Sequence, residues 1–176
     1  MITIGTMKMV LAVVASFAAG VALAQQAPQY GCDSPESKQM DFWVGTWDLS
    51  YKGPNGQPTT SRNRVSKVLD GCAILEEFDG GAGTRLAGRS FSVYDRATKR
   101  WRQTWVDNTA SYLELDGATV DGNFAFVRTV TRNGKTSHQR MVWRDVKPDS
   151  FTWLWQASPD GQAWTTQWEI AYTRAK

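Results

Sequence analysis

The sequence predicts an all-β protein, an antiparallel up-and-down meander of about ten strands closed into a barrel. Short runs of alternating apolar and polar residues recur along the chain, and turn sequences separate them. No segment after the N-terminal leader sustains a helical repeat beyond a turn or two. A barrel is favoured over a two-sheet sandwich, because closure removes both edge strands of a long meander.

Residues 1–24 are expected to be a secretory signal peptide. Lys8 precedes an apolar run, and the small-residue triplet Ala-Leu-Ala at 22–24 resembles a cleavage site. Either Met1 or Met7 is the start of this leader. An uncleaved membrane anchor is the alternative, and the short apolar run argues against it. We therefore expect a secreted, periplasmic protein with no stable membrane span after signal cleavage.

A polar lead-in at 25–39 and one β-barrel domain at 40–176 follow the leader. This length is enough for a single hydrophobic core. Several joins between the expected strands contain Asn-Gly or Asp-Gly, which supply the positive φ of tight hairpin turns. The glycine-rich segment 80–88 is expected to be a hairpin loop, because it opens no helix. The expected strands are 45–51, 59–69, 73–78, 86–94, 101–106, 111–116, 123–132, 137–146, 150–156 and 164–172.

The chain contains two cysteines, Cys32 and Cys72. An isolated pair in an oxidising compartment usually forms a disulfide, which here would join the lead-in to the strand at 73–78. A metal site is not expected, because His138 is the only histidine and such sites need several ligands. The formal net charge is +3 with no basic run, which argues against nucleic acid as a partner. The sequence leaves the oligomeric state open.

Nine tryptophans are the most distinctive feature of the composition. Residues an even number apart on a strand share one face of the sheet. We expect these rings mainly to fill the barrel core, and the alternative is that some line a cavity for a flat, apolar ligand. The tryptophan pairs with even spacing are Trp101 and Trp105, Trp153 and Trp155, and Trp164 and Trp168.

Polar residues alternate with apolar ones on several expected strands, so they lie either on the surface or in a cavity. Glu76, Gln103, Asp107 and Arg140 are candidates for an inward polar cluster, and His138 shares the strand face of Arg140. A one-residue slip in register would reverse these assignments. The candidate ligand-binding residues are Glu76, Gln103, Trp105, Asp107, His138, Arg140, Trp153 and Trp168.

No established catalytic motif is present, so no catalytic residue is assigned and no cofactor is expected. The leading hypothesis is binding of a small apolar or aromatic ligand without chemistry. An isomerase or hydrolase using Glu76, Asp107, His138 or Arg140 is the first alternative, and it requires these side chains to converge. An envelope structural or assembly partner is the second alternative, and it requires a large exposed apolar patch.

The segment Gly45-Thr46-Trp47 resembles the G-x-W signature of the calycin superfamily, which includes the lipocalins. That resemblance implies a helical turn closing the barrel base, with Trp47 packed beneath an arginine near the chain end, here Arg174. The haem-binding nitrobindins are similar in fold, but their glycine-rich opening is matched only at Gly45 and Trp47.

A longer pattern resembles an uncharacterised bacterial family with a lipocalin-like barrel. Members carry a "FDFWLGEW"-like opening, a "GC" followed by an acidic strand, and a "W-x-Q-x-W-V-D" strand. The matching segments are "QMDFWVGTW" from Gln39, "LDGCAILEEF" from Leu69 and "WRQTWVD" from Trp101. The resemblance implies the fold and a ligand cavity, and it implies no established activity.

Overall fold

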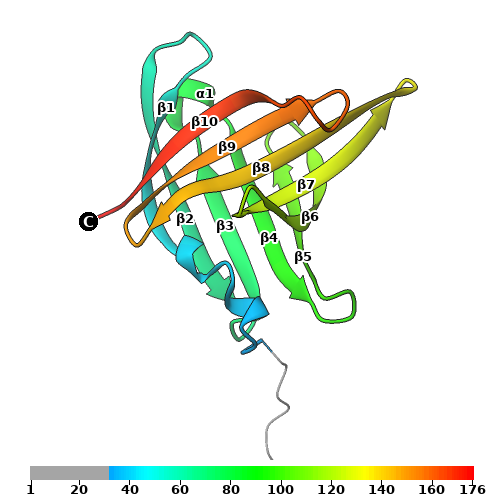
Figure 1. Cartoon of the computed structure of the whole chain (residues 1–176). Coiled ribbons are helices and arrows are strands. Elements are labelled where there is room, and N and C mark those ends of the chain that lie inside the picture. The colour runs from blue at the N-terminus through cyan, green and yellow to red at the C-terminus, as the bar shows by residue number, and fades with distance from the viewer. Residues whose placement is uncertain (1–31) are drawn as a thin grey trace, which may run out of the picture.

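Ten antiparallel strands form a closed barrel in the computed structural model, which describes residues 32–176 (Figure 1). The predicted all-β meander is confirmed, whereas the predicted signal peptide lies outside the described residues. Each strand pairs with the next one along the chain. The strands are β1 (Gly45–Lys52), β2 (Pro58–Val68), β3 (Ala73–Asp79), β4 (Ala87–Asp95), β5 (Arg100–Asp107), β6 (Tyr112–Val120), β7 (Asn123–Arg132), β8 (Lys135–Lys147), β9 (Ser150–Ser158) and β10 (Thr165–Arg174).

The first and last strands close the barrel. β1 pairs with β10 in a register that places Trp47 opposite Arg174 and Leu49 opposite Tyr172. This seam leaves neither strand with a free edge, so the two-sheet sandwich does not occur. No helix among residues 32–176 is long and apolar enough to cross a membrane.

The segment before β1 covers one end of the barrel, which we call the base. It contains two 3₁₀ helices, η1 (Glu36–Lys38) and η2 (Asp41–Trp43). Met40 and Trp43 are buried there and belong to the main hydrophobic core. The base is therefore filled by the chain's own apolar side chains.

Gly45 makes the turn from the base into β1. Its φ is +147°, a value that residues with a side chain rarely adopt, and a Cβ there would overlap the Arg174 guanidinium. That guanidinium lies 4.2 Å from the Trp47 ring centroid, and its Nη1 donates to the Val44 carbonyl at 3.2 Å. The Trp47 Nε1 donates to the Trp43 carbonyl at 2.8 Å. Gly45, Trp47 and Arg174 thus form one contact group at the base.

The predicted disulfide is confirmed: Cys32 is bonded to Cys72, 40 residues further along the chain. The bond joins the lead-in to the turn before β3. It therefore fixes the covering segment to the barrel wall that it closes.

Two loops differ from prediction. The strand expected at 111–116 continues to Val120, because Gly117 is a point of close approach to β5 and does not make a turn. A Cβ at Gly117 would lie 2.6 Å from the Cβ of Trp101. The glycine-rich loop after β3 contains a four-residue helix, α1 (Gly81–Thr84), where only a hairpin loop was expected.

The prediction that Trp164 and Trp168 share one face is wrong. A register shift between Thr166 and Trp168 interrupts the alternation along β10. Trp168 packs against the core, whereas the ring of Trp164 stacks with Arg140, whose guanidinium carbon lies 4.0 Å from the ring centroid. The bulge therefore sends the two indoles to opposite sides of the wall.

Candidate functional site

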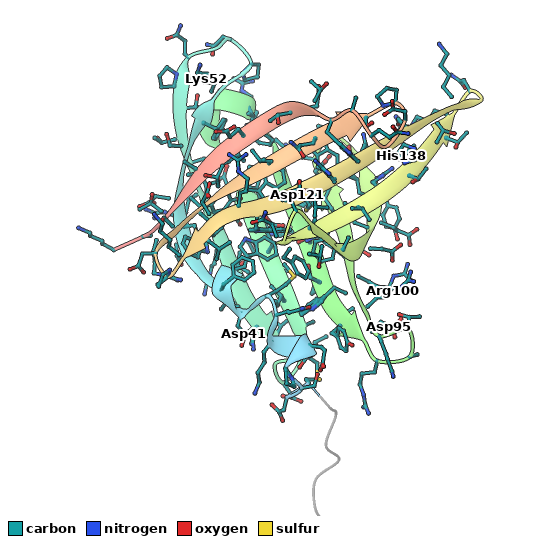
Figure 2. The ribbon with its side chains drawn as sticks, in the orientation of Figure 1. Asp41, Lys52, Asp95, Arg100, Asp121 and His138 are labelled. Carbon is teal, nitrogen blue, oxygen red and sulfur yellow. A yellow bond between two sulfur atoms is a disulfide. The ribbon has the colours of Figure 1, made fainter. Side chains whose placement is uncertain are left out.

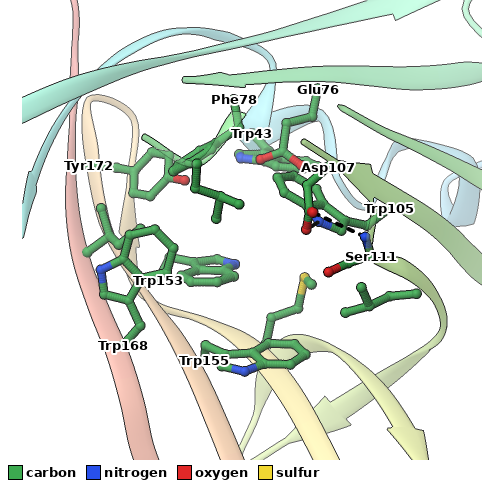
Figure 3. A pocket seen from close by; sticks show the side chains of 14 residues that line it. Trp43, Glu76, Phe78, Trp105, Asp107, Ser111, Trp153, Trp155, Trp168 and Tyr172 are labelled. Carbon is green, nitrogen blue, oxygen red and sulfur yellow. Dashed lines mark hydrogen bonds between the residues drawn. The ribbon is translucent and has the colours of Figure 1, made fainter. Parts of the chain in front are cut away.

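A cavity of about 230 Å³ lies inside the barrel (Figure 3). Trp43 reaches it from the base, and Asp107 and Ser111 lie at the other end, on either side of the turn between β5 and β6. Its aliphatic contacts come from β6, β8, β10 and the loop before β4. The tryptophans that line it are Trp43, Trp105, Trp153, Trp155 and Trp168.

The two tryptophans of β9 form part of the cavity wall. Trp153 and Trp155 are stacked with an interplanar angle of 12° and ring centroids 6.4 Å apart, as their even spacing predicts. Trp168 meets Trp153 edge to face at 6.0 Å. These rings line a cavity, so core filling accounts for only part of the tryptophan content.

Trp105 lies on the opposite wall, where a glycine makes room for it. A Cβ at Gly88 of β4 would overlap the six-membered part of the Trp105 ring. The Trp105 Nε1 donates a hydrogen bond of 2.9 Å to Oδ2 of Asp107. Gly88 therefore lets the indole lie flat against β4, and Asp107 fixes its orientation.

Glu76 places a buried carboxyl group in the cavity wall. Its Oε1 accepts a hydrogen bond of 2.7 Å from Asn63 Nδ2, and its Oε2 accepts one of 2.7 Å from Ser90 Oγ. The same Asn63 nitrogen donates to the Tyr172 hydroxyl at 3.2 Å. Burial raises the pKa of Glu76 to about 6, although the hydrogen bonds from Ser90 and Asn63 oppose the shift.

Gln103 extends this polar network away from the cavity. Its Nε2 donates to Ser90 Oγ at 3.3 Å and to Ser92 Oγ at 3.0 Å, and all three residues are buried. Gln103 therefore contacts Glu76 only through Ser90. Asn63 and Ser90 hold the carboxyl group in place and Ser92 holds Gln103, but no motif or spacing in the sequence marks these three residues.

Asp107 is a second acidic group on the cavity surface. Partial burial favours a higher pKa, but hydrogen bonds from Thr109, Trp105 and the Ser111 backbone N–H outweigh it and lower the pKa of Asp107 to about 2. Asp107 is therefore ionised at neutral pH.

His138 and Arg140 do not reach this cavity, contrary to expectation. The alternation along β8 turns Met141 and Trp143 inward, so His138 and Arg140 lie on the outer face. Figure 2 shows His138 towards the far end of the β7–β8 hairpin, away from Asp41 at the base. His138 Nδ1 lies 3.1 Å from Thr129 Oγ1.

Arg140 is held on that outer face by neighbouring strands. Its Nε donates to Gln156 Oε1 at 2.7 Å, and Gln156 Nε2 donates to Thr166 Oγ1 at 3.0 Å. Of the predicted ligand-binding residues, the cavity brings together Glu76, Trp105, Asp107, Trp153 and Trp168. Residues 32–176 contain no group of three or more His, Cys, Asp or Glu arranged to hold a metal ion.

The raised pKa of Glu76 predicts a stability that depends on pH. A carboxyl group with a folded-state pKa of about 6, against an ordinary value of 4.5, stabilises the fold below pH 4.5 and loses this contribution as pH rises through 6. We expect the free energy of unfolding to fall by about 2 kcal/mol across this range through Glu76. Glu76→Gln should remove this fall, as measured by urea unfolding between pH 4.5 and 7.5.

Glu77→Gln is the matched control for this measurement. Glu77 is the next residue on β3 and faces outward, where it pairs with Arg89 at 3.7 Å. The free energy of unfolding of this variant should change with pH as it does in the wild type. If the free energies of unfolding of the wild type and Glu76→Gln change with pH in parallel, the prediction is contradicted.

Fold and site together define a closed, ten-stranded antiparallel β-barrel protein with an aromatic-lined internal cavity. The chain belongs to the family described as "Protein of unknown function (DUF1579)", whose model matches residues 33–174. The expected membership of an uncharacterised family is thereby confirmed, and the match spans the whole barrel. No curated protein matches the chain.

Proposed function

We propose that this protein binds a small, largely apolar or aromatic molecule inside the barrel, as lipocalin-like barrels do. The observation that carries the proposal is the cavity itself, which five tryptophans line together with a few polar groups. Small-molecule sites typically combine apolar and aromatic walls with a few placed polar side chains. Trp105, Trp153 and Trp168 would provide contact area, and Glu76 and Asp107 would orient the ligand.

The cavity volume limits the size of this ligand. Sites for drug-sized molecules usually enclose about 300–1,000 Å³, and this cavity is smaller, at about 230 Å³. A compact molecule with one or two rings, or an equally small branched one, fits this volume. A long acyl chain would have to extend beyond the cavity.

Secretion to the periplasm is part of the proposal. The leader at 1–24 has the pattern of a signal peptide, and the Cys32–Cys72 disulfide is typical of proteins from an oxidising compartment. Binding of a small molecule in that compartment needs no cofactor.

The two alternative functions have weaker support. An enzyme built on Glu76, Asp107, His138 and Arg140 needs these side chains in one cleft, whereas the last two lie on the outer face. An assembly partner needs a continuous exposed apolar patch. The exposed Phe91 lies between Leu75 and Thr104 on the neighbouring strands, and the exposed Val93 lies opposite Arg102, so polar side chains border the apolar ones on that outer surface.

Binding of neutral aromatic probes tests the proposal. Indole and 2-naphthol should bind with a measurable heat in isothermal titration calorimetry and should raise the melting temperature, because a ligand of the native state stabilises it. Leu113 lines the cavity, so Leu113→Trp should fill it and weaken binding at least about tenfold. Tyr112→Trp adds an indole at the neighbouring exposed position and should leave binding unchanged.

Two results would overturn the proposal. One is the absence of binding by both neutral probes to the folded wild type. The other is equal loss of binding in Leu113→Trp and Tyr112→Trp.

A further inference from the structure

The cavity carries two acidic groups and no basic one. Of the fourteen side chains that line it in the described chain, none belongs to lysine, arginine or histidine. The ion pairs found among residues 32–176 include neither Glu76 nor Asp107. Both carboxylates therefore face the cavity without a cationic partner.

Neutral groups hold both carboxylates in place. Glu76 accepts hydrogen bonds from an amide and a hydroxyl group, Asn63 and Ser90. Asp107 accepts hydrogen bonds from the Trp105 indole and from backbone and hydroxyl groups of the β5–β6 turn. These donors orient the carboxylates but leave their negative charge in place.

Arg89 is the basic residue whose charge lowers the pKa of Glu76, and it lies on the outer face of the barrel. Its side chain is half exposed and pairs with Glu77 on the outer face of β3. Solvent and Glu77 therefore screen its charge from the cavity. Burying an unpaired carboxylate is costly, so a positively charged ligand would remove this cost when it binds.

The aromatic walls favour the same kind of ligand. Tryptophan has the strongest attraction for cations among the aromatic side chains, because the face of its ring is electron-rich. Trp153 and Trp155 lie nearly parallel, and Trp168 stands edge-on against Trp153. Phe78 meets both Trp168, at 5.8 Å, and Trp105, at 6.0 Å, which continues the aromatic lining to the opposite wall.

We propose that the ligand of this cavity is a small organic cation, a protonated amine or a quaternary ammonium ion. This inference rests on the proposed ligand-binding function and specifies its ligand class. The cationic centre sits among the tryptophan rings, and Glu76 and Asp107 balance its charge. An anionic ligand would meet two like charges and no donor side chain of opposite sign.

Three probes of nearly identical shape separate charge from apolar contact. Choline is the cation, 3,3-dimethylbutan-1-ol is its neutral counterpart, and 3,3-dimethylbutanoate is the anion. At pH 7.5, isothermal titration calorimetry should show choline binding at least about tenfold more tightly than the alcohol, and the anion binding most weakly. Indole is titrated in the same series to test the proposed function by itself.

Two variants test whether the preference for choline over the alcohol comes from the carboxylates of Glu76 and Asp107. Glu76→Gln should lower the choline affinity about tenfold and leave the affinity for the alcohol unchanged, whereas Glu77→Gln removes the same charge from the outer face and should change neither. Asp107→Asn is the second variant and covers the case in which Glu76→Gln does not fold. Near-ultraviolet circular dichroism checks the fold of each variant.

The outcomes separate the two proposals. The cation inference is overturned if choline and the alcohol bind with equal affinity, or if the anion binds most tightly. In either case, binding of indole still upholds the proposed function. A choline preference that survives both Glu76→Gln and Asp107→Asn also overturns the cation inference. If neither indole nor 2-naphthol binds the folded wild type, the proposed function is overturned, and this inference, which rests on it, is overturned with it.

Discussion

Trp47→Ala is expected to lower the free energy of unfolding by about 4 kcal/mol, within the range measured for buried aromatic residues replaced by alanine. Trp47 is completely buried at the base of the barrel. Its ring meets Phe151 edge to face at 4.8 Å, and Arg174 covers it at 4.2 Å. The substitution would open a cavity and leave the Arg174 guanidinium without its aromatic partner.

Chemical denaturation monitored by circular dichroism measures this effect. Trp164→Ala is the matched control, because Trp164 is only partly buried and lies on the outer face, and it should cost much less. Ligand binding to folded Trp47→Ala should be retained, since Trp47 does not line the cavity. A loss of binding without a loss of stability would show that Trp47 belongs to the functional site.

Replacing both cysteines by serine is expected to lower the free energy of unfolding by about 4 kcal/mol. This is the second of the two largest effects that we expect. The bond between Cys32 and Cys72 spans 40 residues, and a loop of this length restricts the unfolded chain by about that amount in the chain-entropy model. The effect acts mainly on the unfolded state. The double variant should therefore keep the circular dichroism spectrum and the ligand affinity of the wild type.

Reductant provides the control for the disulfide. Urea unfolding of the wild type with reductant should give the midpoint of the Cys32→Ser/Cys72→Ser variant, and reductant should not change the midpoint of the variant itself. A wild type whose stability is the same with and without reductant would contradict the prediction.

The site was predictable where the pattern of one strand was unambiguous. Along β5, Trp101, Gln103, Trp105 and Asp107 follow at every second position, and the structure turns this set towards the barrel interior. The large aromatic side chains determine the inward face there, and the polar residues between them follow by alternation. Asp107 reaches the cavity in this way, whereas Gln103 faces inward but lies behind Ser90 and does not line the cavity.

On β4 the alternation of apolar and polar residues predicts the wrong inward face. Phe91 and Val93 alternate with Ser90 and Ser92, and apolar burial alone would turn the first two inward. In the structure Phe91 is 51% exposed and Ser90 is fully buried. Pairing decides the face, because Ser90 lies opposite Glu76 on β3 and opposite Trp105 on β5.

The number and order of the strands, most of the turns and the disulfide pair follow from the sequence alone, because alternation, turn residues and the presence of just two cysteines can be read without the neighbouring strands. The direction of the side chains of Ser90, Arg140 and Trp164, inward or outward, depends instead on how their strands pair in the folded barrel. A bulge or a register depends on the neighbouring strand, and one residue of shift reverses a face. The cavity depends on the same pairing, because it brings Glu76 and Asp107 from separate strands to the lining of one space together with five tryptophans.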